Sequence, residues 1–253
     1  GLVGSEMCIR DSPYDTLEKF GLTREMIEDL PMHVLDDLSA GLRSPVLPIK
    51  VKNDNGDEIA CRSRFSFVYS DEGKVQAVFY PALKTAPLEK FGAEEQKSLM
   101  AGKTIVSDMN LSDGLSTRAY IQIDPETRQV ITVPASLIEN NLKLASDAFH
   151  LAQQEVTSIK NGKPLTFSIG NDPITIGVDL TDKKGIRICE GDDIEWKNQS
   201  KKEWGKYTFG CYGCWITDSD GNHDYISEED YTEELWDEQK KAGQRNISSG
   251  LRK

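Results

Sequence analysis

Three glycines at nearly equal intervals organise this chain. Gly41, Gly102 and Gly162 are 61 and 60 residues apart, and each of them ends a stretch with helical character. A helix commonly ends with a residue in the left-handed backbone conformation, which glycine adopts without steric cost. A period near 60 residues indicates a repeated supersecondary unit. The sequence therefore predicts that one arrangement of helix and strands is built about three times.

Strand patterns follow each of these glycines. After Gly41, residues 46–52 and 58–69 have the strand character and apolar-polar alternation of half-buried strands, and a hairpin turn, Asn53–Gly56, separates them. Similar strands follow Gly102 and Gly162. We expect an α+β fold of about three repeated helix-plus-antiparallel-meander units, followed by an acidic helical C-terminal tract. The expected boundaries are 13–90, 91–148 and 149–190 for the units and 191–253 for the tract. In the tract, residues 192–206 and 227–242 have helical character, and residues 211–217 and 224–226 have strand character.

The first residues of the chain look foreign to the fold. The run LVGSEMCIRD at residues 2–11 resembles a translated adaptor that a transposase attaches when sequencing libraries are prepared. We therefore predict that residues 1–12 are not native and leave them, with Cys8, out of the fold. The four remaining cysteines are scattered, which does not suit a secreted disulfide framework and favours a reducing cytoplasm.

The charge balance restricts the partners. The net charge is −12, whereas proteins that bind nucleic acid or anionic membranes usually carry an excess of Lys and Arg. No apolar run approaches the roughly 18 residues of a membrane span. Residues 218–238 contain ten acidic residues and no Lys or Arg. Such a run is usually a solvated face of the protein. Two alternatives are that the run binds a basic partner, or that it shields a nucleic-acid site until the run is displaced.

Several short segments together carry a resemblance. They are Gly21–Thr23, Leu38–Gly41 with Pro45–Pro48, Glu94–Lys103, Tyr120–Asp124, Trp204–Tyr207 and Glu229–Trp236. In these segments the chain resembles domains of unknown function that are encoded on conjugative and mobilisable elements of Bacteroidetes. The resemblance spans most of residues 13–245. It implies a setting of plasmid or transposon DNA handling, because members are sometimes encoded with, or fused to, a type IA topoisomerase. It implies no catalytic residues.

Cys211 and Cys214 form the sharpest local motif, because two cysteines at this spacing are able to share a metal ion or to form a redox pair. A structural zinc site needs four ligands. Cys189 and His223 are the candidates to complete it, although their spacing fits no common template. If the segment is a strand, the two thiols point to opposite faces, and buried small side chains are the simpler interpretation.

A calcium loop is a second metal hypothesis. The spacing of calcium ligands is matched by five oxygen-bearing side chains, which are Asp218, Asp220, Asn222, Asp224 and Glu229. However, His223 stands where such a loop requires glycine. An Asp-Gly hairpin followed by a capped helix explains the same residues.

Basic and aromatic residues interleave between residues 196 and 212, as they do on surfaces that stack single-stranded nucleic acid. Acidic residues balance the lysines here, so a core-packing aromatic stripe with lysines at its rim is the alternative. The candidates for a partner or nucleic-acid surface are Trp196, Lys201, Lys202, Trp204, Lys206 and Tyr207.

The favoured function is that of a non-catalytic, cytoplasmic accessory protein of a mobile genetic element. Its partner would be a protein of the DNA-processing or transfer machinery, such as a topoisomerase or a conjugation protein. Two alternatives stay open. One is direct nucleic-acid binding as an accessory domain of a topoisomerase-like system. The other is a metal-dependent enzyme that uses the region of Cys211, Cys214 and His223. We predict no catalytic residue and no cofactor.

Overall fold

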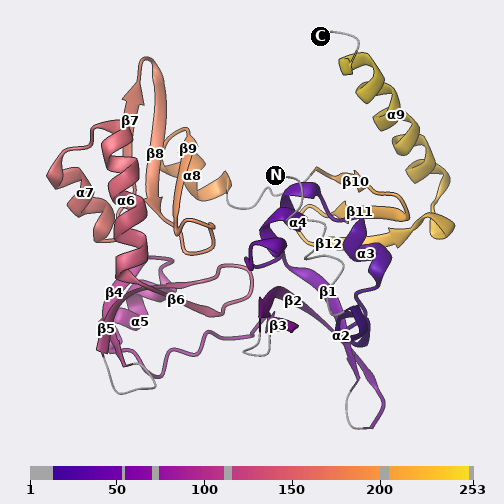
Figure 1. The fold of residues 1–253 in the computed structure, drawn as a ribbon, viewed down its shortest axis with the longest axis horizontal. Helices are drawn as coiled ribbons and strands as arrows, with labels where there is room; N and C mark the ends of the chain where they lie inside the picture. Colours follow the sequence, from indigo (N-terminus) through magenta and orange to yellow (C-terminus); the bar gives the residue numbers. More distant parts are fainter. Residues whose placement is uncertain (1–13, 53–54, 70–73, 111–115, 200–204, 251–253) are drawn as a thin grey trace. The chain divides into compact units, whose positions relative to one another are not determined.

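The computed structural model describes residues 14–52, 55–69, 74–110, 116–199 and 205–250 (Figure 1). The chain divides into two compact units. Unit 1 combines residues 1–81 with residues 202–253, and unit 2 consists of residues 82–201. Residues 1–12, which the sequence predicts to be non-native, lie outside the described part of the chain.

Unit 1 contains two antiparallel meanders of three strands each, with the orders β1-β2-β3 and β10-β11-β12. Three short helices precede the first meander, and a long helix follows the second. The elements are α2 Tyr14–Lys19, α3 Arg24–Glu28, α4 Met32–Ser39, β1 Leu47–Lys52, β2 Glu58–Tyr69, β3 Val75–Pro81, β10 Tyr207–Phe209, β11 Gly213–Thr217, β12 His223–Ser227, the 3₁₀ helix η1 Glu228–Asp230 and α9 Glu233–Gly250.

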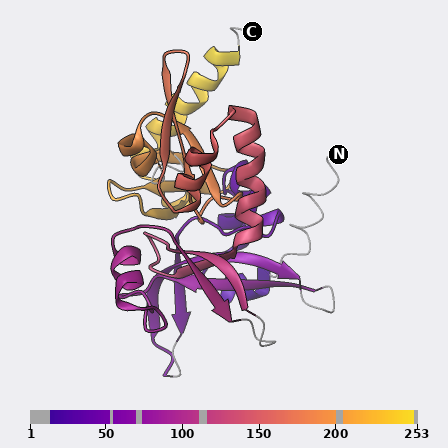
Figure 2. The ribbon, with the colours of Figure 1, turned by 90° about the vertical axis from the view of Figure 1, so that its left-hand side faces the viewer.

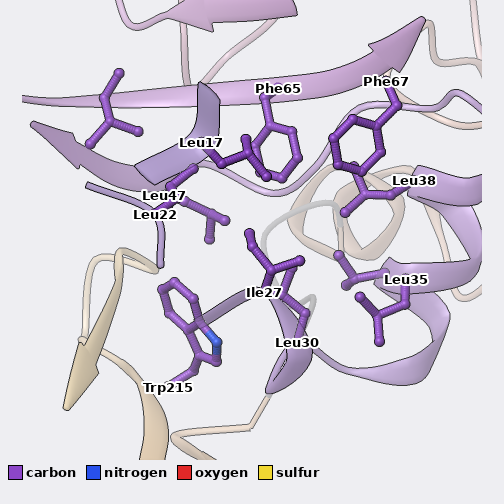
Figure 3. Packing of buried hydrophobic residues seen from close by; sticks show 12 residues of the cluster. Leu17, Leu22, Ile27, Leu30, Leu35, Leu38, Leu47, Phe65, Phe67 and Trp215 are labelled. Carbon is purple, nitrogen blue, oxygen red and sulfur yellow. The ribbon is translucent and has the colours of Figure 1, made fainter. Parts of the chain in front are cut away.

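The core of unit 1 is built from its three short helices, the first meander and Trp215 of the second (Figure 3), and Tyr225 of the second meander packs against it. Successive side chains of a strand point to opposite faces, which places Phe65 and Phe67 of β2 together on the core side. Trp215 of β11 is fully buried among them. Its indole Nε1 donates a hydrogen bond of 3.1 Å to the carbonyl of Met26, which is 189 residues away in the sequence. The second meander thus supplies part of the core of the first.

Unit 2 contains two further meanders, with the orders β4-β5-β6 and β7-β8-β9. Its elements are α5 Ala93–Met100, β4 Ile105–Asn110, β5 Ser116–Ile123, β6 Val130–Pro134, α6 Ala135–Phe149, α7 Gln153–Lys160, β7 Leu165–Ile169, β8 Asp172–Val178, β9 Ile186–Glu190 and α8 Asp193–Gln199.

Helix α6 joins the two meanders of unit 2 (Figures 1 and 2). Its buried residues Ile138 and Leu142 belong to one hydrophobic cluster that also contains Tyr120 of β5 and Ile176 of β8. The helix therefore packs against both sheets at once, and burial of this apolar face is the main stabilising contribution of the contact.

Helix α8 covers the other face of the sheet β7-β8-β9. Trp196 of this helix is 8% exposed, and its indole Nε1 donates to the carbonyl of Arg187 at 3.2 Å. The Arg187 guanidinium lies 4.0 Å from the centre of the Trp196 ring and 2.8 Å from the Asp179 carboxylate. Gly177 of β8 makes room for this ring, because a Cβ there would lie 2.8 Å from Trp196 Cζ2.

The structure confirms the α+β class and the antiparallel meanders. Gly41, Gly102 and Gly162 each follow a helix with φ values between 72° and 77°, as the helix-end prediction requires. Each of the three glycines precedes one meander. The strands expected at 46–52 and 58–69 correspond to β1 and β2, since both depend on a local alternation that neighbouring residues set by themselves.

The C-terminal tract contains the expected helices as α8, which is shorter than expected, and α9, and the strands expected at 211–217 and 224–226 correspond to β11 and β12. Together with β10 at residues 207–209, which the sequence did not predict, these strands form a fourth meander. The helix expected over 227–242 starts later, at Glu233, because Tyr231 has an extended backbone with ψ of 131°. The effective helix start is Thr232, whose Oγ1 accepts the backbone N–H of Leu235 at 3.3 Å.

Within the described ranges, no helix has the length and apolar character of a membrane-spanning segment.

Candidate functional site

The two cysteines of the local motif occupy different environments. Gly210 to Gly213 form the tight connection between β10 and β11. Cys211 lies in this connection and is exposed, whereas Cys214 lies on β11 and is buried. Burial raises the pKa of the Cys214 thiol to about 11. A thiol with such a pKa is protonated at neutral pH and is a poor nucleophile and metal ligand.

His223 is a buried residue of β12. Its Nδ1 lies 3.0 Å from Thr217 Oγ1 on the neighbouring strand. Burial, together with the positive charges of Arg62 and Arg64, lowers the pKa of His223 to about 4. The imidazole is therefore neutral at physiological pH and is held inside unit 1.

Asp218 and Asp220 lie in the turn between β11 and β12. The Asp218 carboxylate accepts the backbone N–H groups of Asp220 at 2.9 Å and Asn222 at 2.8 Å. The hydrogen bond from the Asn222 side chain, followed by these backbone bonds, lowers the pKa of Asp218. This is the hydrogen-bonding pattern of a turn-forming aspartate. Over the described ranges, no three His, Cys, Asp or Glu side chains come together as ligands for a metal ion.

The predicted basic and aromatic surface is divided between the two units. Trp196 belongs to unit 2, where its ring packs under Arg187, whereas Lys206 and Tyr207 belong to unit 1. The other three predicted residues, Lys201, Lys202 and Trp204, lie outside the described residues.

The carboxylate of Asp29 joins the end of α3 to the β10-β11 turn and to β12, and the sequence did not predict this junction. Asp29 follows α3, is 4% exposed, and accepts the backbone N–H of Cys211 at 2.6 Å and of Tyr212 at 3.0 Å. The Tyr225 hydroxyl donates to the same carboxylate at 2.7 Å, and burial followed by this hydrogen bond raises the pKa of Tyr225. A Cβ at Gly210 would overlap the carboxylate. The only sequence signal was the pair of glycines that brackets the turn, which is typical of a close backbone approach.

A cavity of about 470 Å³ lies beside this junction in unit 1. Arg62 reaches across it from β2, donating to the carbonyl of His223 at 2.9 Å and pairing with Asp224 at 3.1 Å. Burial raises the pKa of the Cys61 thiol at the same cavity. The charged groups here hold strands together, and the thiol is not activated. The cavity is lined by Gly21, Met26, Pro48, Ile49, Lys50, Ala60, Cys61, Arg62, Asp224 and Tyr225.

The outer side of the second meander carries a row of aromatic rings. Tyr207 and Phe209 are two residues apart on β10 and so share one side of the sheet, while Trp215 lies on the core side. Ring centroids are 6.1 Å apart between Tyr207 and Phe209, 6.2 Å between Phe209 and Tyr231, and 5.1 Å between Tyr231 and Trp236. We call these four residues the aromatic face.

Helix α9 covers this row only in part. In the described side chains of α9, residues 233–243, Leu235 alone is buried, and beyond its first turns the helix extends away from the sheet (Figure 1). Trp236 is 37% exposed, and the other three rings of the aromatic face are half-buried. A connected set of aromatic rings thus stays accessible on unit 1.

Negative charge surrounds the aromatic face. Residues 228–238 include seven acidic residues and no basic one, and six of the seven are exposed. Among the described residues, Lys206 places a cation on the face, with its Nζ 4.7 Å from the centre of the Tyr207 ring. A hydrogen bond with Tyr207 and then the negative charges of Glu234 and Glu238 raise the pKa of Lys206. The face therefore already holds one positive group.

Comparison with known families matches residues 10–90, about a third of the chain, to the family described as "Protein of unknown function (DUF4099)". Searches of the curated proteins and of the solved structures give no significant match. The matched segment includes the helices α2 to α4 and the meander β1-β2-β3, whose core contains Trp215 from outside the match. Residues 10–90 thus carry a domain of unknown function, completed in this chain by a strand from its C-terminal part.

Proposed function

We propose that this protein is a non-catalytic accessory protein of a mobile genetic element, and that it binds a protein partner through the aromatic face. The observation that supports the proposal is the connected row of Tyr207, Phe209, Tyr231 and Trp236, with Trp236 exposed at its end. Tyr and Trp are enriched among the residues that contribute most to binding in protein interfaces. Their rings bury a large area, and each keeps a polar group for hydrogen bonding.

The environment of the reactive side chains supports a role without catalysis. Cys61 and Cys214 have raised pKa values, and His223 has a lowered one, each because of burial. Catalytic thiols generally show the opposite shift, and a catalytic base needs a pKa near the working pH. These environments suit structural residues of unit 1, and Cys214 and His223 are two of the side chains that the sequence selects for chemistry.

The resemblance to domains of Bacteroidetes conjugative and mobilisable elements supplies the setting of the proposal. In that setting the protein would act in the bacterial cytoplasm. Its partner would be a component of DNA processing or transfer, and a type IA topoisomerase encoded on the same element is the first candidate.

Pairwise co-purification tests this proposal. The protein is co-expressed with the topoisomerase and, separately, with each transfer protein encoded on the same element. We expect one of them to co-purify with the wild-type chain, and the Trp236→Ala variant to bind it about tenfold more weakly. Tyr69→Ala is the control, because Tyr69 is an exposed aromatic residue on β2, away from the aromatic face in the sequence and in the sheets.

Two outcomes would contradict the proposal. One is that Trp236→Ala and Tyr69→Ala retain the partner equally. The other is that the chain binds no such protein but binds oligonucleotides with an affinity that falls steeply with salt, which would favour the nucleic-acid alternative.

A further inference from the structure

We propose that the segment bound by the aromatic face is arginine-rich. This inference rests on the proposed function and names the chemistry of the partner. It depends on three observations. They are the charge around the aromatic face, the position of Lys206 on that face, and a site in unit 2 where an arginine lies on an aromatic ring and pairs with a carboxylate.

The first observation is charge complementarity. Glu234 lies in the first turn of α9, and Glu238 lies one turn further along the same helix. The Lys206 ammonium lies 4.7 Å from the centre of the Tyr207 ring, and the negative charges of both glutamates act on it. Glu238 also pairs with Lys241 of the same helix at 2.7 Å. A positively charged segment would gain attraction from these carboxylates and from the exposed acidic residues of η1.

The second observation is that a cation already occupies part of the face. The Lys206 ammonium lies over the Tyr207 ring, at a distance within the range of cation–π contacts. Lys206 is exposed, so this contact is easily displaced. It shows that the Tyr207 ring accepts a positive group, and an incoming cation would compete with Lys206 for this ring.

The third observation identifies arginine. In unit 2, the Arg187 guanidinium stacks on Trp196 at 4.0 Å and pairs with the Asp179 carboxylate at 2.8 Å. The aromatic face offers the same two components, an indole or phenol ring and a carboxylate. In the described part of the chain, however, the cation–π contact on this face comes from Lys206 and not from an arginine. A planar guanidinium is able to stack on a ring and bind a carboxylate through two N–H groups at once, which an ammonium does not do.

Fluorescence anisotropy with labelled seven-residue peptides tests this inference on the full chain. One peptide alternates Arg and Gly, and the two others carry Lys or Glu in place of Arg. We expect the Arg peptide to bind about threefold more tightly than the Lys peptide, and the Glu peptide not to bind. The affinity should fall as the salt concentration rises, because salt screens exposed charges.

Matched variants locate the binding. Trp236→Ala and Glu234→Gln should each weaken binding of the Arg peptide about fivefold. Glu94→Gln is the control, because Glu94 is also an exposed acid in the first turn of a helix, α5 of unit 2, and it should change nothing. Lys206→Met should strengthen binding about twofold, since it removes the competing cation. A melting curve for each variant shows whether it has kept its fold.

The outcomes separate this inference from the proposed function. Equal binding of the Arg and Lys peptides, or equal effects of Glu234→Gln and Glu94→Gln, would overturn the arginine assignment. If no peptide binds while Trp236→Ala still abolishes co-purification of the partner, the inference is wrong and the proposed function stands. If the Arg peptide binds through Trp236 but the variant leaves co-purification unchanged, the face binds arginine without serving the proposed partner.

Discussion

Unit 1 and unit 2 each contain two three-stranded meanders. The contacts that join the two halves of each unit, however, differ greatly in the number of residues between the contacting positions. In unit 2, the side chain of Gln122 accepts the N–H of Leu180, 58 residues away. In unit 1, Asp29 accepts the N–H of Cys211, 182 residues away, and Arg62 pairs with Asp224 across 162 residues. Closing a loop about three times longer costs only about 1 kcal/mol more in chain entropy. The greater separation therefore has little effect on stability in itself.

What differs is how each unit depends on the ends of the chain. Every buried residue of the main cluster of unit 2 lies between Tyr120 and Ile186, inside one continuous segment. The cluster of unit 1 takes eleven residues from positions 17–67 and its twelfth, Trp215, from the second meander. Unit 1 should therefore respond to changes near residue 215, whereas unit 2 should not.

Removal of the second meander should have the largest effect. In a chain that ends after residue 199, unit 1 loses Trp215 and all donors to the buried Asp29 carboxylate, and we expect it to unfold. Unit 2 keeps its continuous cluster and should remain folded. Hydrogen exchange of the backbone amides, followed for β2 and β5 separately, checks this prediction. A chain that ends after residue 243 is the control. Unchanged protection of β2 in the shorter chain would show that the first meander is self-sufficient.

Local features of unit 1 could be predicted from the sequence, because neighbouring residues decide them. The left-handed turn at Gly41 and the alternation around Phe65 and Phe67 need no information from the rest of the chain. The residues that pack against Trp215 could not be predicted in this way. A buried tryptophan is compatible with any apolar surface, and nothing in its own segment points to residues 17–67.

The candidate site shows the same limit. Asp29 resembles an ordinary acid at the end of a surface helix, and two of its partners are backbone N–H groups, which every residue other than proline has. Tyr207 was identified from its basic and aromatic neighbourhood, but the same pattern included Trp196, which packs in unit 2. Spacing along the chain does not distinguish a ring on a surface from a ring under an arginine.

The substitution Trp215→Ala should destabilise unit 1 by about 3–5 kcal/mol, because it leaves a large cavity in the core and removes the donor to the Met26 carbonyl. Urea denaturation, followed by exchange of the amides of each unit, measures the effect. Trp236→Ala is the matched control, since its ring is partly exposed, and it should cost about 1 kcal/mol or less. An equal loss of stability in unit 2 would contradict the separation of the two cores.

Acid should weaken unit 1 through His223. The folded state lowers the pKa of His223 to about 4, below the ordinary value of 6.5, so the unfolded chain binds more protons between these values. The stability due to neutral His223 is complete above about pH 6.5 and is lost as the pH falls toward 4, by up to about 3 kcal/mol. Urea denaturation of unit 1 at several pH values checks this, with His223→Gln as the variant whose pH dependence should be smaller. The same slope in both proteins would mean that other groups cause the acid sensitivity.

The smallest of these effects should appear in unit 2 with Gly177→Ala. The added methyl group would lie 2.8 Å from Trp196 Cζ2 and 3.1 Å from Pro164 Cβ. The ring is held between this strand and the Arg187 guanidinium, which is itself paired with Asp179, so it has little freedom to move away. Overpacking of this kind costs about 1–3 kcal/mol. We expect the loss of stability in unit 2 alone, with the β2 amides of unit 1 unchanged in hydrogen exchange.

The control is Gly102→Ala, which changes a glycine with open space around its Cβ position. There the left-handed backbone, and not packing, sets the cost of the substitution. If Gly177→Ala also loosened unit 1, the two cores would have to be coupled, and the contrast in their construction would not make them independent.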